Sequence, residues 1–396
     1  MIVIMSDMHL GADLSYAECK NNLPALEKLI KQIKVSPNVK ELVIGGDLVD
    51  EWFVPAPVNT YQGQGQSGFV TRLAASNSGV FAALNSIIQE GLILVTYVPG
   101  NHDIAITAAS IQTILPGVNQ ARDNVLGLGT YSPVGQPKIA IEHGHRYNFF
   151  CAPDPISNQT IAPGTIMPPG YFFTRIGALA QQQGNLPPGD TTPVVTPNTS
   201  GGTSQDLLYR YWKDWYMTLN MFPISNRFDE DLIVTNMNGF TGTFKVNDLV
   251  PYQLTPGGFI NVNLYNGSQD NWEQRQTQNN VPVHIDAPIA IDSVNSDTYT
   301  DYQSSMQYFM NPSSNKRLVV FGHTHVPLIY VYQNYLNEKC IYANSGTWID
   351  NNPNLTSRHF VVITPQSANA SSQTLVKLYN FENDVVTKMD ENSLRF

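Results

Sequence analysis

The sequence predicts an α/β fold, and three features of its 396 residues support this prediction. Short apolar runs alternate with stretches of helical periodicity up to about residue 150. Further apolar runs follow residue 316 with no long helix between them. A region rich in Pro, Gly, Asn, Gln and Thr separates these two parts. Alternation of strands and helices is typical of a layered sheet with right-handed crossovers.

The chain begins with an expected buried strand at residues 2–5. Leu and Ile then recur at helical spacing from Leu23 to Ile33, and a second apolar run follows at residues 41–44. This order is that of a βαβ unit. A helix is expected around residues 69–89, followed by strands at 92–98 and 138–141.

Four more strand-like runs end the chain. They are expected at residues 317–321, 339–343, 359–364 and 374–379. Because no long helix separates the last three, they suggest either a second sheet or an antiparallel continuation of the first sheet.

The middle of the chain is expected to form an insertion or cap over residues 151–315. Residues 1–150 and 316–396 would then form one discontinuous core. Turn-favouring pairs such as Pro163-Gly164 occur throughout this region. Helical patterns at 206–217 and 298–310 show that the region is not simply disordered. The first pattern carries an aromatic stripe that fits a packed core better than a binding groove, and its members are Tyr209, Tyr211, Trp212, Trp215 and Tyr216.

The composition limits the partners that the protein can have. The formal net charge is −10, without a run of Lys or Arg, and this argues against binding to extended nucleic acid. No apolar stretch approaches the roughly 18 residues of a transmembrane helix. The ion-poor, Asn- and Thr-rich composition slightly favours the bacterial periplasm or cell envelope over the cytoplasm. The three cysteines allow at most one disulfide, and the sequence indicates no oligomeric state.

Acid, amide and imidazole side chains follow five of the expected strands. Ligands of an α/β sheet bind beyond the carboxyl ends of its strands, so these groups are expected to converge. Such a mixed oxygen and nitrogen set suits Mn, Fe, Zn, Co or Ni. The set is too large for one ion, and two ions that share a carboxylate would be suited to phosphoryl transfer. The segments are Asp7-Met-His9, Gly46-Asp-Leu-Val-Asp50, Gly100-Asn-His-Asp103, His143-Gly-His145 and Gly322-His-Thr-His325.

Each segment alone also has a plain structural explanation. Asp7 and His9 could form a turn at the end of a strand, and Asp47 with Asp50 could cap a helix. The combination of all five, each directly after a strand, favours metal binding.

The ordered series D-x-H, G-D-x-x-D, G-N-H-D, H-G-H and G-H-T-H resembles the calcineurin-like metallophosphoesterases. The resemblance covers residues 1–150 and 316–396 and implies a four-layer α/β/β/α sandwich that carries a large loop-rich insertion. It also implies that His102 is catalytic, with Asp103 as its partner. Metal A would be held by Asp7, His9, Asp47 and His325, and metal B by Asp47, Asn101, His143 and His323.

Three further residues are candidates for supporting roles. His145 either binds a metal directly, supports a ligand or faces the substrate. Asp50 is expected to orient a neighbouring ligand, and Trp52 either forms a wall of the substrate site or only packs.

Within the family, three segments are similar to the UDP-2,3-diacylglucosamine hydrolase branch. These are residues 6–10, 46–52 and 344–348. That branch carries Arg in place of His102 and H-G-D in place of His143-Gly-His145. The metal site is therefore carried over from this similarity, and the lipid substrate is not.

The resemblance implies a hydrolase that uses two divalent or trivalent metal ions. Its expected substrate is a phosphomonoester or phosphodiester of a small molecule, nucleotide-sugar or lipid head group, attacked by a metal-bound hydroxide. The alternative is a non-catalytic scaffold or binding protein on the same fold, since a fold alone does not imply activity.

Overall fold

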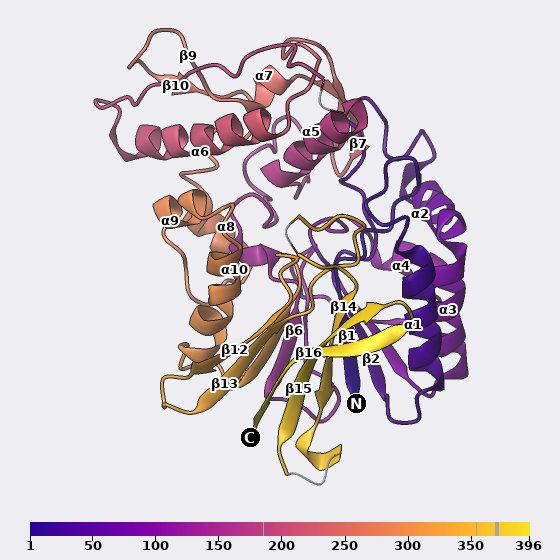
Figure 1. Cartoon of the computed structure of the whole chain (residues 1–396). Helices are drawn as coiled ribbons and strands as arrows, with labels where there is room; N and C mark the ends of the chain where they lie inside the picture. Colours follow the sequence, from indigo (N-terminus) through magenta and orange to yellow (C-terminus); the bar gives the residue numbers. More distant parts are fainter. Residues whose placement is uncertain (185, 354, 369–371) are drawn as a thin grey trace. The chain divides into compact units, whose positions relative to one another are not determined.

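The computed structural model describes residues 1–396 except 185, 354 and 369–371 (Figure 1). The chain forms two compact units. The first comprises residues 1–50, 66–145 and 297–396, and the second comprises residues 51–65 and 146–296. The functional division into a core and a cap at residues 151–315 stays a prediction.

A seven-stranded sheet forms one half of the first unit. β1 lies near its middle, parallel to β2 and antiparallel to β14, so that Ile2 is paired with both Glu41 and Ile363. The strand order is β16-β15-β14-β1-β2-β3-β4. The strands are β1 (Ile2–Met5), β2 (Glu41–Gly45), β3 (Leu94–Val98), β4 (Asn119–Gln120), β14 (His359–Thr364), β15 (Thr374–Glu382) and β16 (Val385–Leu394).

A five-stranded sheet forms the other half of this unit, in the order β12-β13-β11-β6-β5. Its three inner strands are parallel, and the two edge strands are antiparallel to their neighbours. Of the three runs expected to form a second sheet or an antiparallel continuation of the first, 339–343 lies in this second sheet, whereas 359–364 and 374–379 continue the first sheet in antiparallel order. Its strands are β5 (Thr130–Tyr131), β6 (Ile139–Glu142), β11 (Leu318–Phe321), β12 (Leu328–Gln333) and β13 (Lys339–Asn344).

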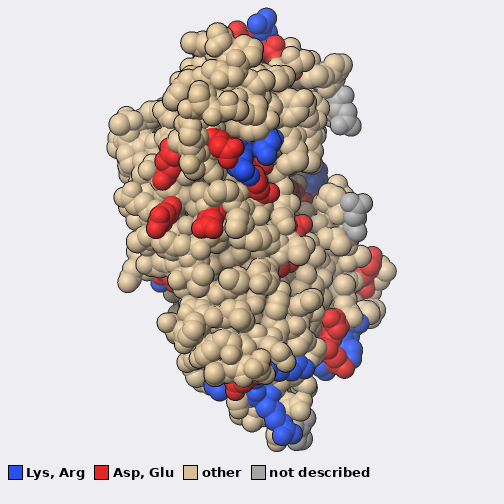
Figure 2. Space-filling model, turned by 90° about the vertical axis from the view of Figure 1, so that its left-hand side faces the viewer, with Lys and Arg blue, Asp and Glu red and all other residues tan. Residues whose placement is uncertain are grey.

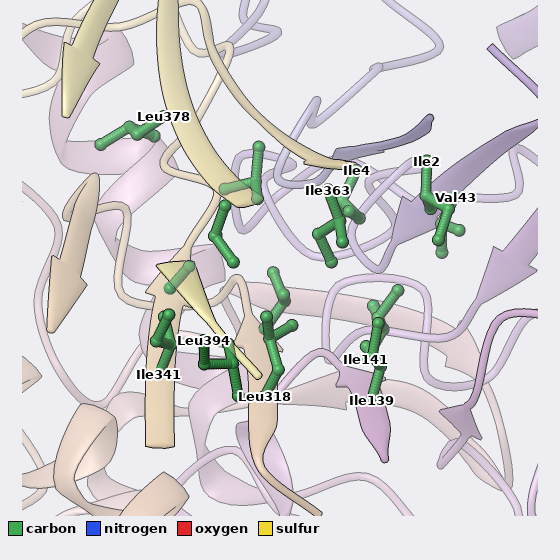
Figure 3. Packing of buried hydrophobic residues seen from close by; sticks show 14 of the residues in the cluster. Ile2, Ile4, Val43, Ile139, Ile141, Leu318, Ile341, Ile363, Leu378 and Leu394 are labelled. Atoms are coloured by element: carbon green, nitrogen blue, oxygen red, sulfur yellow. The ribbon is translucent and has the colours of Figure 1, made fainter. Parts of the chain in front are cut away.

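The core of the first unit lies between these two sheets (Figure 3). Alternate residues of each strand face it, as the two-residue period of a strand requires. Ile2 and Ile4 come from one sheet, and Ile139 and Ile141 come from the other. Burying each aliphatic side chain of this size contributes about 1.5–3 kcal/mol, so the interface fixes the relative position of the strand ends.

Helices cover the outer faces of both sheets (Figure 1). α1 (Leu23–Val35) and α3 (Ser78–Glu90) pack together on the seven-stranded sheet. α10 (Asp297–Ser304), which continues into η2 (Ser305–Phe309), packs on β11. This arrangement confirms the α/β/β/α sandwich expected from the sequence. The other helical segments of the unit are α2 (Gly65–Ser76), α4 (Ala108–Ile114) and η3 (Gln366–Ala368), and η1 (His145–Tyr147) lies at its boundary with the second unit.

The single helix expected around residues 69–89 is instead two helices, α2 and α3. Asn77 separates them with non-helical backbone angles, φ −115° and ψ 34°. Its side-chain amide donates to the carbonyls of Leu73 and Gly11, both within 2.9 Å. An Asn that bonds to the backbone in this way competes with the helix and ends it.

The second unit is rich in loops, as expected. Within α6, Tyr211 and Trp215 are fully buried, whereas Tyr216 is exposed, so most of the aromatic stripe is core. The elements are α5 (Pro169–Gln183), α6 (Gly202–Met221), β7 (Ile233–Met237), β8 (Phe240–Phe244), α7 (Val246–Leu249), β9 (Tyr252–Gln253), β10 (Ile260–Asn261), α8 (Trp272–Gln278) and α9 (Ala287–Asp292).

A buried arginine joins two distant stretches of this second unit. The guanidinium of Arg175 donates to the carbonyls of Val54 at 2.7 Å, Ala56 at 2.9 Å and Val234 at 3.0 Å. Arg supplies five N–H donors in a fixed geometry, which allows one side chain to satisfy several carbonyls. Residues 51–65 therefore belong structurally to the insertion.

The surface carries few charges. Figure 2 shows the charged side chains of one face in small groups of mixed sign among uncharged residues, and the described part of this face has no broad basic area. Over the described residues, no helix is both long and apolar enough to cross a bilayer.

Candidate metal centre

Five loops of the first unit meet at the carboxyl ends of their strands. They follow β1, β2, β3, β6 and β11, and they bring together all seven residues expected to bind metal. Three overlapping groups of side chains have ligand atoms within 4.8 Å of one another. The groups are Asp7, His9 and His325; Asp7, Asp47 and His143; and His9, Glu18, Asp50 and His102.

Most of the expected ligands have a left-handed backbone conformation. Residues other than Gly rarely adopt positive φ angles, because this backbone conformation is strained. It persists only where the surrounding structure fixes it. Its concentration in these loops indicates a functional site. The five residues and their φ angles are Asp7 (53°), His9 (45°), Asp47 (52°), His323 (71°) and His325 (60°).

Two glycines allow the loops to approach closely. A Cβ atom on Gly100 would lie 2.1 Å from Asp47 Oδ1, and one on Gly322 would lie 2.4 Å from Asp7 Oδ2. Both distances are too short for any larger residue. The backbone amide of His323 donates to Asp7 Oδ1 at 3.0 Å, which joins the loops after β11 and β1.

One part of the cluster, named here the His9 half, consists of Asp7, His9, Asp47 and His325. His9 Nε2 lies 3.2 Å from His325 Nε2 and 3.6 Å from Asp47 Oδ2. His325 Nε2 lies 3.3 Å from Asp7 Oδ1. Asp7, His9 and His325 form one of the groups whose ligand atoms all lie within 4.8 Å of one another, and Asp47 adjoins it through His9.

The other part, the His143 half, consists of Asp47, Asn101, His143 and His323. His143 Nε2 lies 3.1 Å from Asp47 Oδ2 and 3.0 Å from Asn101 Oδ1. His323 Nδ1 lies 2.8 Å from the same amide oxygen. The atom Asp47 Oδ2 is therefore close to an imidazole of each half.

The hydrogen bonds of two histidines indicate which of their ring nitrogens faces the cluster. His143 Nδ1 lies 2.9 Å from the carbonyl of Gly45, which can only accept, so Nδ1 carries the hydrogen. The lone pair of a neutral His143 is then on Nε2 and faces the oxygens of Asp47 and Asn101. His9 has the same arrangement, with Nδ1 3.0 Å from Asp50 Oδ2. In the neutral form the lone pair of His143 could bind a cation together with the oxygens, and in the protonated form Nε2 donates a hydrogen bond to them.

Burial and neighbouring charges have opposite effects on most pKa values in the cluster. Burial lowers the pKa of His143, but the carboxylates of Asp47 and Asp7 outweigh burial and raise it to about 9. Burial raises the pKa of Asp47, but the imidazoles of His143 and His102 hold it well below its usual range. Burial, followed by repulsion from His143, lowers the pKa of His323 to about 3. The cluster thus keeps its carboxylates ionised and favours added positive charge.

The structure corrects the expected partner of His102. His102 Nδ1 lies 2.9 Å from Asp50 Oδ1, not from Asp103. The carboxylate of Asp103 instead accepts backbone amides, from Gly100 at 2.6 Å and Leu48 at 3.0 Å. Asp103 follows His102 within a tight turn that directs its side chain toward the backbone. Burial and then Asp47 raise its pKa to about 6.

His145 and Trp52, two of the candidates for supporting roles, are both buried. His145 Nε2 donates to the carbonyl of Gly127 at 3.0 Å, and its ring lies 5.4 Å from that of His143. Trp52 belongs to the second unit, where its ring packs edge-on against Tyr171. His145 therefore lies beside the cluster, and Trp52 packs within the insertion.

Glu18 is a neighbour of the cluster that the sequence did not reveal. Its Oε2 lies 3.2 Å from His9 Nδ1, so His9 is held by the carboxylates of both Glu18 and Asp50. Burial lowers the pKa of His9, but Glu18 and then Asp50 raise it well above its usual value. Glu18 lies in the loop between β1 and α1 and belongs to no recognisable motif, so no sequence signal pointed to it.

Comparisons with known proteins agree with this geometry. Residues 1–164 match the family model of the calcineurin-like phosphoesterases. This segment includes the loops after β1, β2, β3 and β6, and the loop after β11 lies beyond it. No curated protein matches the chain. The similarity to the UDP-2,3-diacylglucosamine hydrolase branch is not confirmed. The matched domain and the clustered metal-binding side chains together support a phosphoesterase.

Proposed function

We propose that this calcineurin-like phosphoesterase domain is a hydrolase of phosphate esters that uses two metal ions. The His9 half would hold one ion and the His143 half the other. The observation that carries the proposal is the position of Asp47 Oδ2, which lies 3.6 Å from His9 Nε2 and 3.1 Å from His143 Nε2. A carboxylate in this position can bridge two ions.

The ligand set suits divalent or trivalent Mn, Fe, Zn, Co or Ni. Two such ions would lower the pKa of bound water toward neutrality and would neutralise the charge of the phosphate. The protein would hold them through side chains whose orientation is already fixed, because His9 and His143 each donate their other ring hydrogen to an acceptor. Supporting hydrogen bonds of this kind determine which nitrogen of a histidine faces the metal.

His102 is proposed to protonate the leaving oxygen as the bond between that oxygen and phosphorus breaks. Its side chain is 13% exposed, so it can reach a substrate. Burial lowers its pKa, but the carboxylates of Asp50 and Asp47 together raise it above its usual value. Asp50 also holds Nδ1 in place. Asp50 is thus a positioning residue for His102 and His9 together.

The proposed substrate is a phosphomonoester or phosphodiester of a small molecule, nucleotide-sugar or lipid head group. The net charge of −10 disfavours extended nucleic acid. The loop-rich residues 151–315 are proposed to act as a cap that limits the size of the substrate.

Elemental analysis combined with two assays tests this proposal. The full-length protein is expected to bind two metal ions per chain. With added Mn it is expected to hydrolyse p-nitrophenyl phosphate, bis-p-nitrophenyl phosphate or both, and the preferred substrate would identify the ester class. A scaffold protein on the same fold would bind no metal and hydrolyse neither substrate. That result would contradict the proposed hydrolase and favour the scaffold protein.

A further inference from the structure

A buried carboxylate lies behind the metal-binding loop that follows β11. Asp301, on α10, is only 6% exposed. It lies beyond the residues matched by the family model and is not one of the expected metal ligands. Its surroundings connect it to the segment that carries His323 and His325.

Three side chains donate hydrogen bonds to one oxygen of this carboxylate. The hydroxyl of Tyr342 donates to Asp301 Oδ1, and the hydroxyl of Thr324 lies 3.2 Å from the same atom. Nδ2 of Asn344 lies 3.3 Å from it. Tyr342 and Asn344 are fully buried, so water does not compete for these bonds.

Asn344 extends the network to the backbone of the loop. Its Nδ2 lies 2.7 Å from the carbonyl of Gly322 and 3.0 Å from Thr324 Oγ1. Its Oδ1 accepts the backbone amide of Gly346 at 2.9 Å, which fixes the orientation of the side-chain amide. Thr324 lies between the two histidines in sequence and is bonded to both Asp301 and Asn344.

The loop needs such support because its conformation is unfavourable. His323 and His325 have φ angles of 71° and 60°, which L-residues other than Gly rarely adopt. Residues in these conformations persist only where the surrounding structure determines them. Within the loop, Asp301 bonds to Thr324. The residues on either side of Thr324 belong to different halves of the cluster, His323 to the His143 half and His325 to the His9 half.

We propose that Asp301, acting through Thr324 and Asn344, is a positioning residue that holds His323 and His325 in their metal-binding geometry. The inference rests on the proposed metal site and extends that site to α10. Asp301 is not one of the proposed metal ligands and acts through Thr324 and Asn344, so its loss is expected to weaken metal binding first and hydrolysis only as a result.

Metal affinity of full-length variants tests the proposal. Asp301→Leu removes the acceptor, and we expect its affinity for Mn, measured by competition with a chelator, to fall about 10- to 100-fold, the usual cost of losing a residue that supports a ligand. Asp301→Asn keeps an oxygen acceptor and is expected to restore most of this affinity. Thr324→Val removes only the hydroxyl and is expected to weaken Mn binding with little change in Tm. Tyr302→Ala, at an exposed position of the same helix, is the matched control and is expected to bind Mn like the wild type.

The outcomes separate this inference from the proposed function. If Asp301→Leu and Thr324→Val lower the Tm of the metal-free protein but bind Mn as tightly as the wild type, Asp301 is only a structural residue. If Asp301→Leu does not fold, Thr324→Val alone decides the question. A wild-type protein that binds no metal would overturn both this inference and the proposed function.

Discussion

Two buried aspartates, one in each compact unit, have opposite electrostatic environments. Asp47 of the metal cluster is 1% exposed, and Asp214 of α6 is 8% exposed. Burial raises the pKa of both. The imidazoles of His143 and His102 reverse the effect at Asp47, whose pKa lies well below its usual range. At Asp214, Asp292 adds to the effect of burial and the pKa rises to about 8.

The difference shows that burial alone does not decide the charge of an acid. Asp47 keeps its charge because neighbouring imidazoles stabilise it, and a metal ion would take over that role. Asp214 Oδ2 has no hydrogen-bond partner within the described residues. At neutral pH the protonated, uncharged acid is therefore favoured over a buried carboxylate. Asp47 is therefore charged and suited to its proposed role as a metal ligand, whereas ionisation of Asp214 at high pH is expected to lower the stability of the protein.

The largest expected effect comes from Asp47→Asn. The amide keeps the shape of the side chain but removes the negative charge that both halves share. We expect both metal ions to be lost, together with hydrolysis. Elemental analysis and the p-nitrophenyl assays measure the two losses, and a variant that retains two ions per chain would contradict the bridging role of Asp47.

The next effect is expected from His102→Ala. This change leaves the proposed metal ligands in place but removes the proposed proton donor, which typically contributes a hundredfold or more to the rate. We expect two ions per chain and a turnover that is lower by about a hundredfold. Unchanged turnover in the metal-loaded variant would exclude the catalytic role of His102.

Glu18→Gln is expected to have a smaller effect that is confined to one half of the cluster. His9 would lose one of the two carboxylates that hold Nδ1, and loss of such support typically costs 10- to 100-fold in metal affinity. Because Asp50 remains, we expect about tenfold weaker binding of one ion and unchanged binding of the other. Two-site calorimetric titration measures both affinities, with Glu27→Gln, at a partly exposed position of α1, as the control. An equal loss at both sites would contradict the localised role of Glu18.

Asp214→Asn is expected to leave hydrolysis unchanged and to alter only stability. The folded pKa of about 8 lies above the unfolded value of 3.8, so the stabilising contribution of the protonated acid is complete below pH 3.8 and is lost as the pH rises to 8. Relative to the wild type, the free energy of unfolding of the variant is expected to rise by about 4 kcal/mol between pH 5 and pH 9.

Urea unfolding across this pH range measures the effect. The matched control is Asp231→Asn, whose side chain is 71% exposed in the same unit. Its difference from the wild type is expected to stay constant with pH. A constant difference for Asp214→Asn as well would show that Asp214 is ionised in the folded protein at pH 7.

The sequence predicted the elements and the metal-binding loops where apolar runs end in polar residues. β1, β2 and β11 are fully buried, so each is visible as an unbroken apolar run. Asp7, Asp47 and His323 follow these three runs, each two residues after its strand ends. Their convergence could be predicted because the carboxyl ends of parallel strands lie at one edge of a sheet.

Other features depend on contacts that local sequence does not encode. β12 and β16 were not predicted, because they are edge strands with exposed residues and lack an unbroken apolar run. Glu18 and Asp301 reach the cluster from positions far from any motif, and only the folded chain reveals their partners. The exchange of Asp103 for Asp50 as the partner of His102 depends on the direction of a single turn.

The hydrogen bonds from Arg175 to several backbone carbonyls affect how the second unit can vary during evolution. One guanidinium joins residues 54–58 to Val234 in the interior of the insertion, so the framework of that unit does not depend on its outer loops. Those loops can change length and composition while the framework persists. If residues 151–315 act as the proposed cap, variation of these loops would change substrate preference without alteration of the proposed metal ligands.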